Sequence, residues 1–377
     1  MFKKSVRYLF IIFSALIFSS IVSAIPYIDF IDPTPSNNAE TLSTSFTINL
    51  SITEQNINQI KYNWNGTNYT LFNSNLVLFT ELNNNSALNE NSTGFKDSSP
   101  SQHTGLCFNC PTLVTGKYGN AYNFDGINDA LNFSSSITGA DLTNKTIMAW
   151  IYPQKSQQQS IVDKDFDHGA PSYGGWGLWL QSNNKLWWWN HANKDILDTG
   201  SMTAANNAWS HVAVVWDSNA KMAYFYINGK LNSNKSDSTI VEKASNAVIL
   251  SIGSFRNITG SYFNGTIDEV QVWNISMTKD QIYQQYASNV HKYNSTQWYV
   301  YINQSKNATD TLGYAAYTYS ASAMNSSGSE NATSERTINI VSSLTSSSVP
   351  EFSDYAFFFI LIISLASFFY IKKENTP

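Results

Sequence analysis

The segment from Lys117 to Tyr286 contains an ordered series of short strand and turn patterns. Apolar and polar residues alternate in AWSHVAVVWD and YFYINGKL, and this period of two is typical of half-buried strands. Asn228-Gly229 predicts a two-residue hairpin, because both of its positions must adopt a positive φ. Further on, Thr278 and Gln281 have the spacing of a helix capping box. The series predicts an all-β, two-sheet sandwich that ends in a short helix.

The overall composition fits short strands joined by polar turns. Aromatic residues make up 14% of the 377 residues, whereas charged residues make up only 13%. The net charge is −5, and no cluster of Lys and Arg occurs between the two apolar ends of the chain. A nucleic-acid-binding surface needs such a basic cluster. The composition therefore argues against nucleic acid as a partner.

Residues 1–24 have the pattern of an export signal peptide. Lys3, Lys4 and Arg7 precede an apolar stretch, and small residues stand before the expected cleavage point after Ala24. An uncleaved membrane anchor is the alternative interpretation. The export signal predicts that the rest of the chain leaves the cytoplasm.

A second apolar segment lies near the carboxyl terminus. A Ser-rich linker, 342–354, precedes apolar residues 355–371 and a tail, 372–377, that begins with two lysines. The apolar stretch is close to the minimum length for a transmembrane helix, and the lysines favour a cytoplasmic tail. A buried core helix is the alternative. The pattern predicts a protein held at the cell surface, with its main part extracellular.

The tripeptide just before this segment carries a resemblance of its own. Pro350-Glu351-Phe352 resembles the PEF-type sorting tails of archaeal surface proteins. That resemblance implies that the tail is cleaved and exchanged for a lipid. Whether the tail is retained or cleaved stays open.

Two flanking regions, 25–75 and 291–341, show further strand patterns. Phe46, Ile48, Leu50 and Ile52 alternate with polar residues in the first region, for example. Neither region has enough strands for a stable sandwich of its own, which needs about seven. We therefore expect them to form one immunoglobulin-like sandwich with the central domain, 76–290, inserted in a loop. Two separate small β units are the alternative.

The central region resembles the LamG-like jelly-roll domains of the concanavalin A-like lectin/glucanase superfamily. The order and spacing of several short motifs carry this resemblance, rather than any one motif. The flanks also resemble those of archaeal surface proteins that hold this domain inside an immunoglobulin-like one. The matching residues are Gly119-Asn120-Ala121, Phe124-Asp125-Gly126, Asp129, Ala149-Trp150-Ile151, Trp209, His211-Val212-Ala213-Val214, Tyr226-Ile227-Asn228-Gly229, Gly265 and Ile267-Asp268-Glu269-Val270.

Asp125, Asp129 and Asp268 are the candidate metal ligands. Calcium is bound by several oxygen atoms from carboxylates and backbone carbonyls, and the resemblance implies a structural calcium ion held by these segments. The first and last strands of such sandwiches commonly pair, which would bring Asp125 near Asp268. The alternative is that Asp125 and Asp129 cap a turn and that Asp268 is a solvated strand residue.

Tryptophans are concentrated between residues 176 and 189, and they are the candidate ligand-binding residues. Period-two geometry places Trp187 and Trp189 on one face of a strand and Trp188 on the other. Exposed aromatic rings stack on sugars and mark binding surfaces. The alternative is that most of these rings are core. The predicted binding set is Trp176, Trp179, Trp187 and Trp189.

Cys107 and Cys110 are the only cysteines of the chain. A zinc site would need two more ligands at a suitable spacing, and none follows. Because an exported chain meets an oxidising environment, we expect a disulfide between them. Sequons for N-glycosylation are also abundant, Asn303 among them, and they suit a glycoprotein of the cell exterior.

The sequence favours a non-enzymatic surface protein that binds an extracellular glycan or a surface protein, with calcium as an optional structural ion. Glycoside hydrolases of this fold are the first alternative. They use two carboxylates across the scissile bond, and their usual Glu-x-Asp-x-x-Glu pattern is missing here. A purely structural envelope protein is the second alternative.

Overall fold

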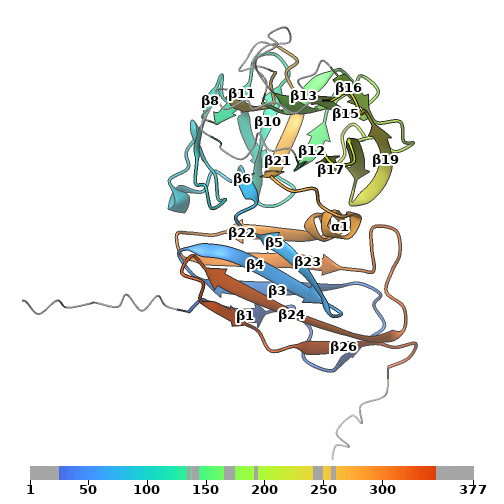
Figure 1. The fold of residues 1–377 in the computed structure, drawn as a ribbon. Coiled ribbons are helices and arrows are strands. Elements are labelled where there is room, and N and C mark those ends of the chain that lie inside the picture. Colours follow the sequence, from blue (N-terminus) through green and yellow to red (C-terminus); the bar gives the residue numbers. More distant parts are fainter. Residues whose placement is uncertain are drawn as a thin grey trace, which may run out of the picture.

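The computed structural model consists of two β-sandwiches, one stacked on the other (Figure 1). It describes residues 25–133, 137, 144–164, 175–190, 194–240, 249–255 and 260–344. The predicted signal peptide, 1–24, and the predicted transmembrane helix, 355–371, lie outside these ranges. Within them, no helix is long and apolar enough to cross a membrane.

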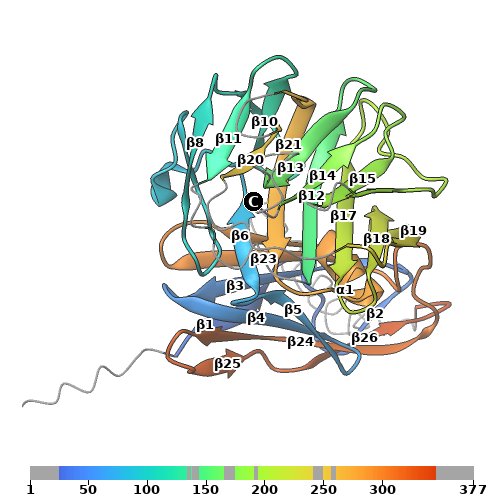
Figure 2. The same ribbon diagram turned by 45° about the horizontal axis from the view of Figure 1, so that its top comes forward.

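The central sandwich has two eight-stranded antiparallel sheets (Figure 2). We call the one beside the other sandwich the junction sheet. Its order is β19-β18-β17-β12-β21-β10-β9, and β6 also pairs with β21. Its strands are β6 (Leu76–Thr80), β9 (Thr112–Thr115), β10 (Asn120–Asp125), β12 (Lys145–Pro153), β17 (Ser210–Asp217), β18 (Met222–Ile227), β19 (Lys230–Ser236) and β21 (Asn264–Trp273).

The second sheet of the central sandwich lies farther from the other sandwich, and we call it the distal sheet (Figure 1). Its order is β16-β15-β14-β13-β20-β11-β8-β7. Its strands are β7 (Gly94–Lys96), β8 (Thr104–Phe108), β11 (Ala130–Phe133), β13 (Gln159–Lys164), β14 (Trp176–Leu180), β15 (Leu186–Asn190), β16 (Lys194–Leu197) and β20 (Leu250–Ile252), and the 3-10 helix η1 (Ser86–Leu88) precedes β7.

Local sequence explains how these strands are joined. Asn228 and Gly229, between β18 and β19, have φ values of 51° and 73°, which the hairpin prediction required. After β21, Thr278 caps the helix α1 (Lys279–Ala287), and a capping box with Gln281 is present. Both predictions from the sequence are confirmed.

The flanking regions together form the outer sandwich, as expected. β3 from the first flank pairs with β23 from the second over eight residue pairs, and β4 pairs with β24. One sheet has the order β1-β3-β23-β22, and the other has the order β2-β26-β24-β4-β5 with β25 beside β24. The strands are β1 (Tyr27–Ile31), β2 (Ala39–Thr41), β3 (Phe46–Thr53), β4 (Ile57–Trp64), β5 (Thr67–Phe72), β22 (Ser288–Lys292), β23 (Gln297–Gln304), β24 (Ala315–Asn325), β25 (Glu330–Ala332) and β26 (Arg336–Ile340).

The central sandwich is therefore an insertion between β5 and β22 of the outer one. The first strand of the second flank, β22, begins at Ser288, a few residues before the expected boundary at 291. An immunoglobulin-like fold for the outer sandwich stays a prediction.

The two sandwiches share an apolar core. Met148, Val215 and Trp273 are buried in the junction sheet and belong to the same apolar cluster as Phe72 and Trp298 of the outer sandwich. Such burial stabilises by roughly 25 cal/mol per Å² of apolar surface. The junction is consequently a packed interface rather than a flexible link.

Placing a charge in this interface is expected to destabilise both sandwiches together. Val215 is 1% exposed, so Val215→Asp would bury a carboxylate without a partner and cost about 3–5 kcal/mol of unfolding free energy. Thermal unfolding measures the effect, with Thr53→Asp at an exposed position of β3 as the control. Equal melting temperatures for the two variants would contradict the shared core.

Candidate functional site

The tryptophans of β14 and β15 divide between the two faces of the distal sheet. Trp176 and Trp188 point into the core, where their ring centroids lie 6.0 Å apart in a stacked arrangement. Trp188 has no exposed surface. These two residues therefore stabilise the sandwich, and the prediction of a binding role for Trp176 is not supported by its position.

The opposite, outer face of the distal sheet carries the other tryptophans. Trp179 pairs across the strands with Trp187, so both rings lie on one side of the sheet, with centroids 5.0 Å apart. The Trp179 indole nitrogen donates a hydrogen bond of 3.0 Å to the Asp163 carboxylate. Trp179 and Trp189 are only 3% and 2% exposed, whereas Trp187 is half-buried. Of the four predicted binding residues, Trp187 alone remains accessible enough for a ligand.

Trp187 lines a pocket of about 220 Å³ together with Gln158, Gln181, Ser182 and Leu197. The Gln181 side chain donates a hydrogen bond to the Leu186 carbonyl, which holds it at the pocket. The described lining offers one indole, one leucine, two amides and one hydroxyl, and no charged side chain.

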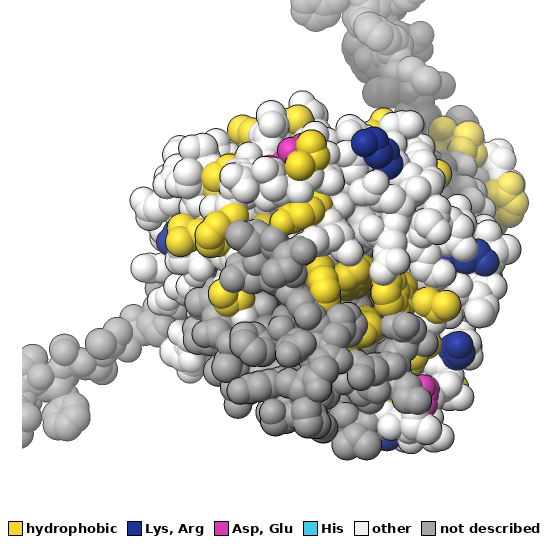
Figure 3. All heavy atoms as spheres, turned by 90° about the horizontal axis from the view of Figure 1, so that it is seen from above, with side chains coloured by type: hydrophobic (Ala, Val, Ile, Leu, Met, Phe, Trp, Pro, Cys, Tyr) yellow, Lys and Arg dark blue, Asp and Glu magenta, His cyan; other side chains and the backbone are white. Residues whose placement is uncertain are grey.

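The described lining determines what this pocket can bind. Figure 3 shows the molecule from above, where the described part of the surface carries several hydrophobic side chains and few charged ones. A half-buried indole with neutral donors and acceptors suits a neutral polyhydroxylated ligand, because the ring packs on C–H groups while the amides bond to hydroxyls.

The predicted metal ligands do not form one site: Asp129 lies beside Asp125, but Asp268 lies apart from both. β10 pairs with β21 as expected, but the register places Asp125 opposite Asn264, four residues along the strand from Asp268. At about 3.3 Å per residue this separation is roughly 13 Å. The expected juxtaposition of Asp125 and Asp268 is wrong, because strand pairing does not determine register. Among the described residues, no group of three or more His, Cys, Asp and Glu is arranged to hold a metal ion.

Each of the three carboxylates has a structural role instead. The Asp125 carboxylate accepts hydrogen bonds from the backbone amides of Ile127 and Asn128, and Asp129 accepts one from the Asp125 amide. Asp268 accepts bonds of 2.8 and 3.1 Å from the amides of Lys117 and Tyr118. This donor set does not fit the predicted calcium ion.

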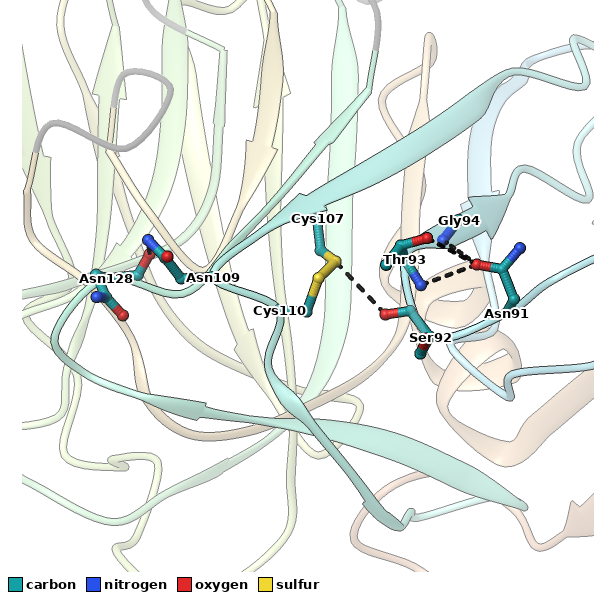
Figure 4. Close-up of a disulfide and its surroundings, with 8 residues drawn as sticks. All are labelled: Asn91, Ser92, Thr93, Gly94, Cys107, Asn109, Cys110 and Asn128. Carbon is teal, nitrogen blue, oxygen red and sulfur yellow. Dashed lines mark hydrogen bonds between the residues drawn. A yellow bond between two sulfur atoms is a disulfide. The ribbon is translucent and has the colours of Figure 1, made fainter.

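The two cysteines form a disulfide, which confirms the prediction (Figure 4). Cys107 lies near the end of β8, and its Cα atom is 4.9 Å from that of Cys110. Because the closed loop is short, the bond removes little conformational entropy from the unfolded chain. We expect Cys110→Ser to lower the melting temperature only slightly, whereas a large decrease would show that the bond supports more than its own loop.

A cluster of buried acids at the junction of the two sandwiches was not predicted from the sequence. It consists of Glu81, Asp268 and Glu269, which are 4%, 0% and 5% exposed; we call it the acid cluster. Glu81 lies 2.6 Å from the His291 ring of β22, and the Lys292 amide donates to it at 3.0 Å. The cluster therefore connects the junction sheet to the outer sandwich.

Burial is the main influence on the pKa values of two members of this cluster, Asp268 and Glu269. It raises the pKa of Asp268 to about 8, although the Tyr118 and Lys117 amides act in the opposite direction. Burial, followed by the charges of Asp268 and Glu81, raises the pKa of Glu269 well above its usual value. One carboxyl oxygen of Asp268 and one of Glu269 have no hydrogen-bond partner. Burial therefore favours the protonated form of Asp268 and Glu269 at neutral pH.

His211 lies in an aromatic pocket on the same side of the junction sheet. Its ring centroid is 5.4 Å from that of Trp150 and 5.7 Å from that of Tyr286. Burial lowers the pKa of His211 to about 3. The histidine is therefore neutral and contributes packing.

Comparison with known proteins supports the fold of the central segment. A family model described as the concanavalin A-like lectin/glucanases superfamily matches residues 125–283. The comparison with curated proteins found no match.

Three solved structures illustrate the structural likeness. Domain 4 of AbnA, a GH43 extracellular arabinanase from Geobacillus stearothermophilus, in complex with arabinotriose, is 17% identical with a TM-score of 0.43, and the match covers 55% of this chain and 96% of that one. The binding domain of Paraclostridial Mosquitocidal Protein 1 is 18% identical with a TM-score of 0.43, covering 55% and 50%. A Trypanosoma rangeli sialidase is 14% identical with a TM-score of 0.39, covering 56% and 32%. At these identities and TM-scores, the similarity concerns the fold and not the function.

The two-sheet sandwich and the family match over residues 125–283 together support a jelly-roll domain of the concanavalin A-like type in the centre of this chain.

Proposed function

We propose that this protein is a binding protein of the cell surface whose central jelly roll takes a neutral carbohydrate in the Trp187 pocket. The observation that carries the proposal is the position of Trp187 in an uncharged pocket lined by amides, a hydroxyl and a leucine. The neighbouring tryptophans are buried beneath or beside it. The Trp179 ring packs against the accessible ring, with centroids 5.0 Å apart, and a restricted ring lowers the entropy cost of binding.

The residues of the pocket favour a protein that binds carbohydrate over an enzyme that hydrolyses it. A glycoside hydrolase needs two carboxylates on either side of the scissile bond. The described lining of the Trp187 pocket contains none, and the nearby Asp163 carboxylate is bonded to the Trp179 indole.

The location of the protein is part of the same proposal. We infer from residues 1–24 and 355–371 that the chain is exported and anchored in the membrane, with both sandwiches outside. The disulfide between Cys107 and Cys110 supports this location, because such bonds persist in oxidising surroundings.

A glycan array with the full-length protein in detergent tests the proposal. We expect wild-type protein to bind neutral glycans and Trp187→Ala to lose these signals. Leu42→Ala, a control at another exposed apolar residue, should keep them. An array without any signal above background for wild-type protein would contradict the function, and the structural envelope protein would then be favoured.

A further inference from the structure

The outer face of the four-stranded sheet in the outer sandwich carries a row of tyrosines. Along β23, Trp298, Val300 and Ile302 point inward and are at most 1% exposed. Because side chains alternate along a strand, Tyr299 and Tyr301 point to the opposite, outer face. This face belongs to β1, β3, β23 and β22, outside the family match (Figure 1).

The tyrosine rings form a continuous row. The Tyr299 and Tyr301 rings are stacked with centroids 6.2 Å apart, and Tyr293 meets Tyr299 edge-on at 5.8 Å. Tyr293 and Tyr301 are 54% and 37% exposed. We call Tyr293, Tyr299 and Tyr301 the tyrosine row. Flat rings that follow one another along a sheet offer a track for an extended ligand, rather than a pocket for a compact one.

Contacts from the central sandwich hold one end of this row. The Asn85 side-chain amide donates hydrogen bonds to the carbonyls of Lys292 and Tyr293, at 3.2 and 2.9 Å. The His291 ring lies 6.3 Å from that of Tyr293 and is bonded to Glu81. The row is therefore preorganised by the junction.

Neutral polar side chains lie beside the row on β3 and at the start of β23. The Gln297 side chain donates to the Ser51 hydroxyl at 2.9 Å and accepts from the Thr53 hydroxyl at 3.1 Å. Along the described strands β1, β3 and β23, no lysine or arginine is present. The carboxylate on these strands is that of Asp29, which accepts a hydrogen bond of 3.3 Å from the Tyr27 hydroxyl. The ammonium group of Lys292, on β22, lies over the inward-facing Trp298 ring at 4.8 Å.

This charge pattern selects among possible partners. Nucleic acids, sulfated polymers and anionic membrane surfaces all bind through clusters of lysine and arginine, which the face lacks. A polymer of neutral sugars matches it, because C–H surfaces stack on tyrosine rings and hydroxyls bond to glutamine, serine and threonine.

We propose that the tyrosine row is a second carbohydrate-binding surface, which binds an extended chain of a neutral polysaccharide. It is separate from the Trp187 pocket, which lies on the distal sheet of the other sandwich. The proposal therefore stands or fails independently of a ligand in that pocket.

Retention on insoluble cellulose and chitin, together with affinity electrophoresis in xylan and arabinan, tests the proposal. The protein is produced full length in a host without N-glycosylation, so that no glycan on Asn303 can cover Tyr301. We expect Tyr299→Ala/Tyr301→Ala to weaken binding to at least one polymer about tenfold. Tyr314→Ala, which removes a 72% exposed tyrosine outside the row, should bind as wild type does.

The Trp187→Ala variant separates this surface from the first one. The double tyrosine substitution is also made in this variant, whose pocket can no longer retain a polymer, and we expect it to weaken binding there about tenfold as well. The proposal is overturned if the double variant binds every polymer like wild type, or if wild type binds none. It is also overturned if the double substitution changes only self-association in sedimentation, or only the binding of heparin.

Discussion

The stability of this protein is expected to fall steeply as the pH rises from about 6.5 to 8. The reason is the acid cluster, where burial raises the pKa of Asp268 from 3.8 to about 8 and that of Glu269 well above 4.5. Between the unfolded and folded pKa values the folded state holds more protons than the unfolded state. The free energy of unfolding then decreases with pH, by up to about 1.4 kcal/mol per pH unit for each group.

Two histidines also affect how the free energy of unfolding depends on pH. Burial lowers the pKa of His211 from 6.5 to about 3, so the unfolded state holds more protons between these values and stability there rises with pH. This rise offsets the fall caused by Asp268 up to about pH 6.5, so that only the shallower fall caused by Glu269 remains there. Burial lowers the pKa of His291, but the hydrogen bond and charge of Glu81 outweigh it, and the net increase adds to the fall above pH 6.5.

Urea unfolding of wild type and Asp268→Asn from pH 4 to 9 measures the effect. The amide oxygen of Asn can still accept the hydrogen bonds from the amides of Lys117 and Tyr118, while the charge is removed. We expect a much flatter profile above pH 6.5 for this variant, and a wild-type profile for the exposed control Asp310→Asn. Parallel profiles for wild type and Asp268→Asn would show that the pKa of Asp268 is not raised as inferred.

The burial of Asp268 and Glu269 could not be predicted from the sequence. Strict alternation places Asp268 and Glu269 on opposite faces of β21, with one of them in solvent. In the structure both are buried, because the register of β21 against β12 shifts at this point and Glu269 adopts a φ of 51°. A β-bulge of this kind depends on tertiary packing, and the local pattern does not encode it.

The positions of the tryptophans could be predicted in part from the sequence. Period-two alternation correctly separated Trp187 and Trp189 from Trp188, because the geometry of a strand alone determines which residues share a face. It could not tell which rings would be covered. Trp179 and Trp189 share the face of Trp187 and are nevertheless buried. Exposure depends on neighbouring strands and loops, whose positions only the complete fold specifies.

Replacing Trp188 is expected to cause a second large loss of stability. Its side chain is fully buried in the core of the central sandwich and stacks on Trp176. Removing such a ring leaves a cavity, so Trp188→Ala should lower the free energy of unfolding by about 3–5 kcal/mol. Chemical denaturation measures this loss. Trp187→Ala is the matched control one residue away, and it should cost much less because its ring is half-buried.

A result in which both variants lose the same stability would place Trp187 in the core as well. The Trp187 pocket would then be a consequence of packing, and the proposed ligand site would have to be sought elsewhere on the distal sheet.

The most direct test of the carbohydrate-binding proposal is a calorimetric titration of Trp187→Ala with the best glycan from the array, beside wild type and Trp187→Phe. We predict that Trp187→Ala binds at least about tenfold more weakly, while its melting temperature stays close to that of wild type. Trp187→Phe should recover part of the affinity, because it restores an aromatic ring. Unchanged affinity of a folded Trp187→Ala variant would contradict the proposed function.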